Sequence, residues 1–519
     1  MKRWKAMAKE GRRPNILFVV FDQMRADCLT GALSEAVQLP NLKSLMADGV
    51  TFTNHVSVTS PCGPARASLL TGQYAMNHRS VRNGTPLPQD KPNLATELRR
   101  AGIQPLLYGY TDTSADPRKF AADDPVLTSY EQVMSGFMEA LEMRFDDSRT
   151  WRAYLAGLGY DVPAGEDIYI PMDGPNGRQV DHPAFYKAEH SDTAFLTDRL
   201  LADLPTRGEG WCAHVTFIRP HPPFVAPSPY NSLCQAEDMP PAEVAGTMDT
   251  YLATHPFNGP AMKFRQVADM VRGFPDLESG EAITTRLRAV YMGLIAELDH
   301  HFGRIISYLK ETGQYDDTLI VVTSDHGEML GDHHCWGKMH YYDAAFRVPL
   351  ILRLPPAMSG GKMTGQQISR PTESIDVTPT ILDLLNIPVP DTMDGVPLTP
   401  FLKGEETPQW RRYSVSELDF GDPVSPTIWQ EELGLKSDEC SLAIIRSDSH
   451  TFVQFNADLP PVLFEHTQKG EHENRALDPD MMAMRLEMTE ALLKHRMTHA
   501  EGQFSRIMIT PEGAVRGDF

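Results

Sequence analysis

Two short runs of apolar residues lie far apart in this chain and end in the same way. One covers residues 15–21 (Asn-Ile-Leu-Phe-Val-Val-Phe) and the other covers residues 318–324 (Thr-Leu-Ile-Val-Val-Thr-Ser). Such unbroken runs are typical of strands buried on both faces of a parallel sheet. The polar residues that follow directly are Asp22 and Gln23 after the first run, and Asp325 and His326 after the second. Because ligands bind beyond the carboxyl ends of parallel strands, these side chains indicate a divalent-metal site.

An Asp that follows a single strand more often belongs to a turn or caps a helix. The interpretation as a metal site therefore depends on a third segment. Residues 60–66 read Ser-Pro-Cys-Gly-Pro-Ala-Arg. The prolines stiffen this backbone and delay the start of a helix, which we expect over the following residues as far as Gly72. Cys62 would then lie at a helix N-terminus beside Arg66, where an anion is favoured. On this segment alone, a proline-rich turn with a buried, inert cysteine remains an equal alternative.

The rest of the chain alternates between helical and strand patterns, which predicts an α/β fold with a large, mostly parallel sheet flanked by helices. We expect helices at 40–49, 93–102, 192–204, 284–309 and 375–382, and strands at 50–56, 103–108 and 211–218. The long helix should bury Leu294, Leu298 and Phe302 on one face. After about residue 404 the pattern changes to a hairpin (441–446 and 450–455) and a Met-rich helix (481–499). These elements predict a smaller C-terminal α+β domain with an antiparallel sheet.

A chain of 519 residues is longer than a domain with one hydrophobic core of ordinary size, so two domains are expected. We place the catalytic domain at 14–404 and the second domain at 405–519. Irregular insertions are expected around 117–191, which is rich in Gly, Pro and Asp, and around 228–279, which is rich in Pro, Met and acidic residues. We expect the first of these to run over the active-site face.

Composition limits the partners and the compartment. A formal net charge of −21 argues against binding to nucleic acid or to an anionic membrane. Residues 1–13 lack a secretory pattern, and no segment approaches the roughly 20 apolar residues of a membrane span. The six cysteines show no paired spacing, so a disulfide framework is not expected. We therefore expect a cytoplasmic protein, in which an anionic substrate needs a local positive site.

The segment Cys62-Gly63-Pro64-Ala65-Arg66 matches the pattern C-x-P-x-R. With it, the chain resembles the sulfatase branch of the alkaline phosphatase superfamily over nearly its whole length. The resemblance is greatest to the phosphonate monoester hydrolase/phosphodiesterase group. The other segments that carry it are residues 21–23, 62–72, 77–79, 219–224, 324–328 and 331–334, and Lys338.

The resemblance implies that a formylglycine-generating machinery oxidises Cys62 to formylglycine. The hydrated aldehyde would present one hydroxyl as an oxygen nucleophile, and its second hydroxyl would let the covalent adduct collapse. The resemblance also implies one divalent ion, among Mn, Zn and Ca. Its ligands would be Asp22, Gln23, residue 62, Asp325 and His326.

The remaining roles also follow from the resemblance. Arg66 and Lys338 would stabilise negative charge in the transition state, and His221 would protonate the leaving oxygen or bind the anion. From spacing alone, Lys338 would be taken for a solvated surface residue. For His221, a hydrogen-bonded loop residue is the lesser alternative. We expect that His333 and His334 form hydrogen bonds near the metal site and are not ligands themselves. The residues at the substrate-pocket positions are Asn83, Tyr110, Thr111 and Asp112.

Asp112 departs from the group, in which an uncharged Thr is expected at this place. An added carboxylate beside the pocket should disfavour dianionic substrates and favour a cationic or polar leaving group. Gln23 is a feature of the group where other sulfatases have Asp, and it removes one negative charge near the metal.

The preferred function is hydrolysis of small monoanionic esters, namely phosphonate monoesters and phosphodiesters, with some activity on sulfate monoesters. A dedicated arylsulfatase is the main alternative, because a sulfate monoester carries the same charge. A cysteine phosphatase with a thiolate at Cys62 is disfavoured, since such enzymes have a longer loop between Cys and Arg. A non-catalytic binding protein is disfavoured because every chemically competent residue is present. By resemblance, a homodimer or homotetramer is expected.

Overall fold

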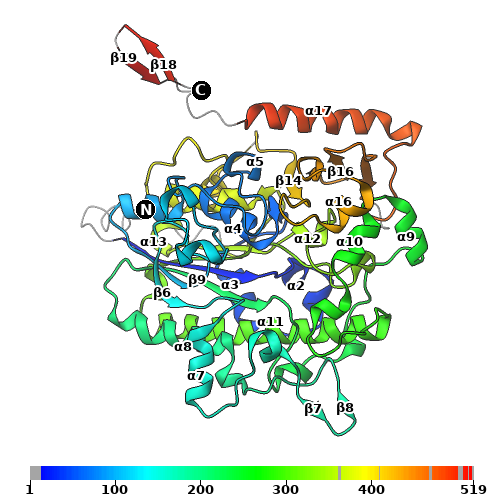
Figure 1. Cartoon of the computed structure of the whole chain (residues 1–519). Coiled ribbons are helices and arrows are strands. Elements are labelled where there is room, and N and C mark those ends of the chain that lie inside the picture. The colour runs from blue at the N-terminus through cyan, green and yellow to red at the C-terminus, as the bar shows by residue number, and fades with distance from the viewer. Residues whose placement is uncertain are drawn as a thin grey trace.

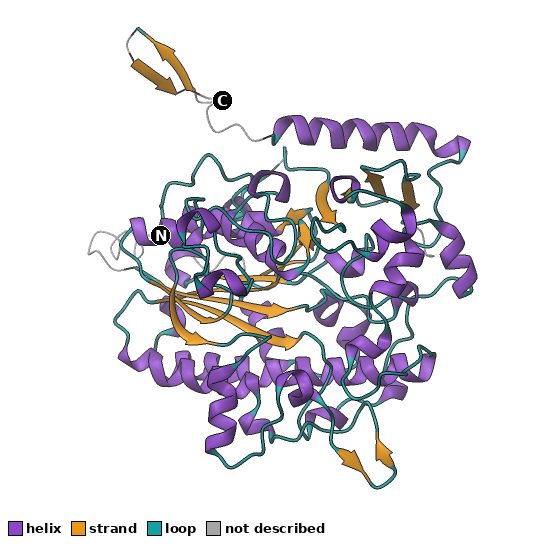
Figure 2. Cartoon of the chain, viewed as in Figure 1, coloured by secondary structure: helices purple, strands orange, loops and turns teal. Residues whose placement is uncertain are grey.

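A computed structural model describes residues 13–359, 364–407, 409–466, 470–500, 507–511 and 513–516. At its centre lies an eight-stranded sheet with the order β12-β2-β11-β10-β1-β9-β5-β6, visible in the middle of Figures 1 and 2. Among the described strands of this sheet, β11 alone runs opposite to the others. The bounds are β1 Asn15–Asp22, β2 Val50–Phe52, β5 Pro105–Gly109, β6 Met138–Glu142, β9 Cys212–Pro220, β10 Thr318–Ser324, β11 Leu350–Arg353 and β12 Gln366–Ile368. The predicted fold class, with its mostly parallel sheet, is confirmed.

The two apolar runs form neighbouring parallel strands at the centre of this sheet. β1 and β10 pair residue by residue, from Asn15 opposite Thr318 to Phe21 opposite Ser324. Every side chain of both strands is buried. Because the strands are parallel and in register, the residues that follow them emerge side by side at one edge of the sheet.

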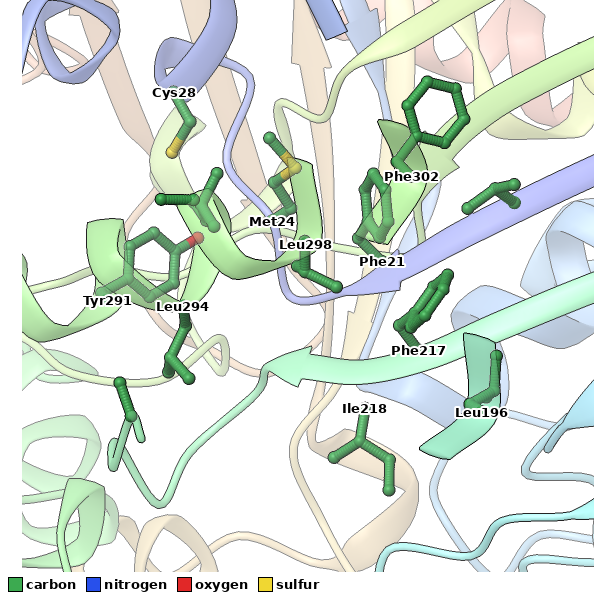
Figure 3. Packing of buried hydrophobic residues seen from close by; sticks show 14 of the residues in the cluster. Phe21, Met24, Cys28, Leu196, Phe217, Ile218, Tyr291, Leu294, Leu298 and Phe302 are labelled. Carbon is green, nitrogen blue, oxygen red and sulfur yellow. The ribbon is translucent and has the colours of Figure 1, made fainter. Parts of the chain in front are cut away.

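One face of the sheet is covered by the long helix α11 (Glu281–Glu311), which packs against α3 (Pro40–Asp48), α8 (Asp192–Asp203) and β9. Figure 3 shows Leu294 and Leu298 of α11 in the same cluster as Phe21 of β1 and Phe217 of β9. Leu294, Leu298 and Phe302 are buried, as the helical spacing predicts.

The opposite face is covered by α4 (Cys62–Thr71), α6 (Leu94–Arg100) and α14 (Val377–Leu384), which contact one another. All ten residues of α4 are buried. The expectation that this helix begins after the prolines is wrong, because it begins at Cys62. Pro64 is tolerated there, since backbone N–H groups in the first helical turn have no partner within the helix.

Two further expectations differ from the structure. Residues 50–56 are not one strand: a bend at Thr53 and Asn54 separates β2 from β3 (His55–Val56), which pairs with β13 (Thr372–Glu373). The segment 117–191 is not wholly irregular, because it contributes β6 and the helix α7 (Arg149–Gly157). β6 pairs with β5 at the sheet edge and is half exposed, so it lacks the apolar run by which a buried strand is recognised.

A second sheet contains five strands in the order β17-β16-β15-β14-β4. The bounds are β14 Ser414–Asp419, β15 Ser441–Arg446, β16 His450–Phe455 and β17 Val462–Glu465, all antiparallel to their neighbours, with β4 (Thr59–Ser60) added parallel to β14. The predicted hairpin and the helix α17 (Met482–Thr498) are present, and Met488 and Leu492 of α17 pack against this sheet. Because β4 directly precedes Cys62, the C-terminal sheet includes a segment of the N-terminal part. The domain boundary near residue 404 stays a prediction.

The shorter elements complete the description. They are the helices α2 Asp27–Thr30, α5 Ala75–His78, α9 Met248–Thr254, α10 Asn258–Phe264, α12 Asp343–Phe346, α13 Pro356–Ser359, α15 Thr399–Lys403 and α16 Ile428–Leu433, and the strands β7 Asp173–Gly174, β8 Gly177–Arg178, β18 Ile507–Thr510 and β19 Gly513–Arg516. The six cysteines are all described and all free. Within the described ranges, each helix is too short or too polar to cross a bilayer.

Gly109 ends β5 with φ +115°, and a methyl group there would overlap the hydroxyl and the carbonyl of Thr216 on β9. We therefore expect Gly109→Ala to lower the free energy of unfolding by about 2–4 kcal/mol. Gly84 is the matched control: its φ is +92°, but no atom lies within 4 Å of an added Cβ. Gly84→Ala should cost only about 1–2 kcal/mol. Equal melting temperatures for the two variants would show that the close approach of β5 and β9 does not restrict the residue type at position 109.

Candidate active site

Four neighbouring parallel strands of the main sheet, in the order β10, β1, β9 and β5, end at one cavity. Asp325 follows β10, Asp22 ends β1, His221 follows β9, and Tyr110 follows β5. The cavity has a volume of about 430 Å³ and is lined by Asp22, His221 and Tyr110, among others. Its position is the carboxyl edge of a parallel sheet, where ligands of α/β proteins bind.

At the base of the cavity, four side chains with metal-binding atoms come together. Candidate ligand atoms of Asp22, Cys62, Asp325 and His326 all lie within 4.8 Å of one another. His326 Nε2 lies 3.9 Å from Asp22 Oδ1, 3.7 Å from Asp325 Oδ2 and 3.2 Å from Cys62 Sγ. All four residues are buried.

The electrostatics of this cluster fit a bound cation. Asp22 Oδ1 is buried and accepts no hydrogen bond from any described residue. Burial, and next the negative charge of Asp325, raise the pKa of Asp22 to about 6. A divalent ion would neutralise both carboxylates and supply the missing partner of Oδ1. The mixed carboxylate and imidazole donors suit Mn or Zn.

Gln23 lies at the border of this cluster and lines the cavity. Its backbone N–H donates to Asp325 Oδ1 (3.0 Å), and its side-chain Oε1 accepts from Lys338 Nζ (2.7 Å). Its Nε2 donates to the buried carboxylate of Glu328. Glu328 therefore orients the side-chain amide of Gln23 so that the Gln23 oxygen faces Lys338. Sequence reasoning did not assign this role to Glu328, although it stands only three residues after Asp325.

The two cations predicted near the nucleophile occupy different places. Lys338 Nζ lies 3.0 Å from Cys62 Sγ and lines the cavity. Arg66 is buried behind the metal-binding cluster: Nη2 donates to Asp22 Oδ2 (2.9 Å) and Nε donates to Asp325 Oδ2 (3.0 Å). Its guanidinium also lies 4.1 Å from the ring centre of Tyr110. In this arrangement Arg66 orients carboxylates, whereas Lys338 faces the space above residue 62.

Cys62, the predicted formylglycine precursor, is the first residue of α4, and its thiol is free and buried. Burial, and next the charge of Asp22, raise the pKa of the Cys62 thiol well above its ordinary value, although Lys338 opposes this shift. A thiol in this setting is neutral at physiological pH, which disfavours a thiolate nucleophile. The cysteine-phosphatase alternative therefore has no electrostatic support.

The predicted substrate-pocket residues do not all face the cavity. Asn83 and Tyr110 line it; Asn83 Oδ1 accepts from the N–H of Gly63 (2.9 Å), and the Tyr110 hydroxyl donates to Asp22 Oδ2 (2.5 Å). Thr111 does not line the cavity. Its hydroxyl donates to the carbonyl of Gln132 (3.0 Å) and accepts from the N–H of Met134, so it holds the loop instead.

Asp112 lines the cavity with a backbone φ of +47°, which is uncommon for a residue other than glycine. Its Oδ2 lies 3.7 Å from Arg66 Nε, and its buried Oδ1 has no hydrogen-bond partner among the described residues. Burial raises the pKa of Asp112 well above its ordinary value, against the opposing charge of Arg66.

His221 lines the cavity and packs against Phe145, with ring centres 4.7 Å apart and planes tilted by 59°. Its Nδ1 lies 2.5 Å from the carbonyl of Pro222, so Nδ1 carries the proton and Nε2 is the free ring nitrogen. Burial, and next the charge of Lys338, keep its pKa well below the ordinary value. His333 and His334 do not line this cavity among the described residues.

Several cavity-lining residues were missed because they come from the segments expected to be irregular. Aromatic and charged side chains of these segments form the upper walls. They are Tyr130, Glu131, Phe145, Asp146 and Glu166 from the first segment, and Phe264, Arg265, Asp269 and Arg272 from the second. The sequence contained no spacing signal for them, only the general expectation that the first segment covers the site.

Comparisons with known proteins agree with this geometry. Residues 14–387 match the protein-family model described as Sulfatase. The multifunctional alkaline phosphatase superfamily protein PehA of Trinickia caryophylli is 39% identical over 517 residues, covering 96% of this chain and 98% of that protein. The choline-sulfatase of Rhizobium meliloti is 30% identical over 410 residues, covering 76% of this chain and 72% of that protein.

Two solved structures are similar along almost the whole chain. The phosphonate monoester hydrolase SpPMH from Silicibacter pomeroyi has a TM-score of 0.95 and 51% identity, covering 97% of this chain and 99% of that chain. The phosphonate monoester hydrolase of Agrobacterium radiobacter has a TM-score of 0.91 and 38% identity, covering 98% of this chain and 100% of that chain.

The raised pKa of Asp22 leads to a prediction for the metal-free protein. The folded-state pKa of about 6 lies above the ordinary 3.8, so the folded state binds this proton more tightly and loses stability as pH rises from about 4 to 6. At pH 8, Asp22→Asn should therefore raise the free energy of unfolding of the metal-free protein by about 1–3 kcal/mol, and should weaken binding of the divalent ion. Thermal unfolding with and without the ion measures both effects.

Asp276→Asn is the control, because Asp276 is exposed and should change neither quantity. A metal-free Asp22→Asn variant that is less stable than the wild type would contradict the assigned repulsion between Asp22 and Asp325.

Proposed function

Since this chain belongs to the sulfatase family and is an ester hydrolase, we propose that its substrates are monoanionic esters, chiefly phosphonate monoesters and phosphodiesters. The two similar structures with 51% and 38% identity are both phosphonate monoester hydrolases. The geometry of residue 62 carries the proposal: Cys62 Sγ lies 3.0 Å from Lys338 Nζ and 3.2 Å from His326 Nε2, beside the unpartnered Asp22 Oδ1.

The family uses a formylglycine and a metal, and the residues of this chain fit both. We assign Cys62 as the formylglycine precursor, whose hydrated aldehyde supplies an oxygen nucleophile and a route for product release. The metal, when bound, lowers the pKa of that oxygen and polarises the ester. Its proposed ligands are Asp22, Gln23, residue 62, Asp325 and His326, and the proposed ion is Mn, Zn or Ca.

The charged side chains around residue 62 are proposed to have different roles in the reaction. Lys338 stabilises the negative charge that develops on the transferred group, because its ammonium lies above the nucleophile position. Burial opposes the charged form of Lys338, but neighbouring acidic groups, among them the carboxylates of Asp22 and Asp325, keep its pKa above the ordinary value, so it stays protonated. Arg66 holds Asp22 and Asp325 in the orientation that the ion requires.

His221 is proposed to act on the leaving group. Its Nδ1 is held by the carbonyl of Pro222, which leaves Nε2 free within the cavity. Because the neutral ring carries its one proton on Nδ1, Nε2 would first have to take up a proton, which the nearby charge of a bound anionic ester would favour. Transfer of that proton from Nε2 to the leaving oxygen would offset the charge formed when the ester bond breaks, and would return the ring to its neutral form. Asn83 and Tyr110 would support the substrate indirectly, since both fix residues of the cluster, and Thr111 would hold the loop that carries Asp112.

The choice of ester class rests on charge. Gln23 places a neutral amide where an additional carboxylate would repel an anion, and Lys338 is the cation that lines the cavity beside residue 62. A single cation in direct contact with residue 62, among the described side chains, suits a monoanionic ester better than a dianion. A dedicated sulfatase is the second candidate, because the similar choline-sulfatase is 30% identical. The modifying machinery, an assembly of two or four subunits and a cytoplasmic location stay predictions.

The test compares turnover of an aryl phenylphosphonate, an aryl phosphodiester and an aryl sulfate by the metal-loaded enzyme. We expect kcat/KM to be highest for the phosphonate monoester, lower for the diester and measurable for the sulfate. A higher kcat/KM on the sulfate would overturn the substrate assignment and favour the second candidate.

Cys62→Ala tests the nucleophile in the same assay and should remove nearly all turnover on all three substrates. The mass of the peptide that contains residue 62 should show conversion of the thiol to the aldehyde. Active enzyme with an unmodified thiol would overturn the formylglycine assignment.

Asp112 should tune discrimination between charge states of the substrate. Because its pKa is raised, its repulsion of a dianion should grow as the pH increases and the carboxyl ionises. At alkaline pH, Asp112→Thr should raise kcat/KM for a dianionic aryl phosphate about tenfold relative to the phosphonate monoester, equivalent to about 1.4 kcal/mol. Asp112→Asn, which keeps the shape, should behave in the same way. Variant ratios that equal the wild-type ratio at every pH would exclude this role.

A further inference from the structure

Outside the active site, three side chains with metal-binding atoms meet from three separate parts of the chain. Glu243 comes from the segment 228–279, His333 from the loop after β10, and His472 from the segment after β17. Candidate ligand atoms of the three lie within 4.8 Å of one another. Glu243 Oε1 is 3.2 Å from His472 Nε2, and the two imidazole rings have centres 5.0 Å apart.

Two of these residues are held in place by the surrounding backbone. The N–H of Glu243 donates to Asp332 Oδ1 (2.7 Å), and its carbonyl accepts from the N–H of His333 (2.8 Å). Asp332 is itself paired with Arg25 and Arg288. The ring of His333 stacks on Tyr342, with centres 3.8 Å apart and planes at 4°. Glu243 and His333 therefore need little further ordering to accept a ligand.

The third part of the cluster depends on a glycine. Gly470 has a φ of +67°, and a Cβ at this position would overlap Glu243 Oε1 and lie 3.4 Å from His472 Nε2. The carboxylate and the imidazole therefore fit together only over a residue without a side chain. A cavity of about 280 Å³, lined by Glu243, His333 and Gly470 among others, adjoins the cluster and leaves room for water.

Few interactions with described residues fix the orientation of the His472 ring. Its Nδ1 is buried without a hydrogen-bond partner among the described residues, and its described ionic contact is the one with Glu243. A buried imidazole nitrogen without a partner costs free energy, which indicates that a water or an ion belongs beside this ring.

We propose that Glu243, His333 and His472 form a second metal site, which binds Zn²⁺ through two imidazoles and one carboxylate. This ligand set is one that zinc takes in proteins, with a fourth position left for water, whereas Ca²⁺ and Mg²⁺ prefer oxygen ligands alone. The site does not depend on the proposed reaction, because it shares no residue with the active-site cluster.

The ion would connect three segments that are distant in sequence. His333 lies five residues before Lys338, which faces the nucleophile position. Binding of Zn²⁺ would therefore fix the segment between His333 and Lys338 against the C-terminal part. The expected consequence is greater resistance to thermal unfolding in the presence of zinc, since an ion that binds only the folded state stabilises it.

The experiment counts bound zinc in the full-length protein by elemental analysis after chelation, reloading with Zn²⁺ and dialysis. We expect two ions per chain for the wild type and one for His472→Gln and for Glu243→Gln. Asp22→Asn should also keep one, at the second site, and Asp22→Asn with His472→Gln should keep none. His300→Gln is the matched control, because His300 is an exposed histidine outside the cluster, and it should keep two.

A second measurement distinguishes loss of the zinc site from poor folding of a variant. Glu243 is more than half exposed at its side chain, with 53% of the surface accessible, so Glu243→Gln should retain the wild-type melting temperature without zinc. Zinc should raise the melting temperature of Asp22→Asn by a few degrees and should not raise that of Asp22→Asn with Glu243→Gln. Equal zinc content in wild type and His472→Gln, or equal melting shifts in the two Asp22 variants, would mean that the cluster is only an ion pair.

Discussion

The ion pairs of Arg66 are the interaction on which the catalytic cluster depends. Its guanidinium bonds to Asp22 at the end of β1 and to Asp325 after β10, while its own helix begins at Cys62. One buried side chain thus fixes α4, the helix that begins at Cys62, relative to two central strands. Removing Arg66 from this group would cost about 3–5 kcal/mol, because the two buried carboxylates would stay without compensation. The same contact keeps two carboxylates close enough to share a metal ion.

The parts of the site that sequence reasoning predicted are those in which local pattern and chemistry coincide. The runs before Asp22 and Asp325 have apolar centres at residues 16–21 and 319–322, which favours buried strands. Parallel pairing of these strands then places Asp22 and Asp325 side by side. The segment from Cys62 to Gly72 carries its own helix signals. Short-range rules suffice here, since each element is specified within about ten residues and the register between β1 and β10 has no offset.

The parts that were not predicted depend on contacts between distant segments. Glu328 orients the amide of Gln23 across a sequence separation of 305 residues. Thr111 points away from the cavity because the loop at Gln132 and Met134 offers its hydroxyl two hydrogen bonds. Phe145 reaches the cavity from a segment without apolar periodicity. Nothing local specifies these directions, so the composition of the cavity walls, and with it the leaving-group preference, could not be derived from sequence patterns.

The C-terminal sheet takes part in building the active site, although its sequence has a different character. β4 pairs with β14, where Thr59 lies opposite Glu417 and Ser60 opposite Leu418. Ser60 also donates its hydroxyl to the carbonyl of Lys338 (3.1 Å). The strand that enters α4 is therefore held by the C-terminal sheet on one side and by the Lys338 backbone on the other. Because both Cys62 and Lys338 are positioned through β4, the C-terminal sheet contributes to the geometry of the candidate active site, wherever the boundary between domains is drawn.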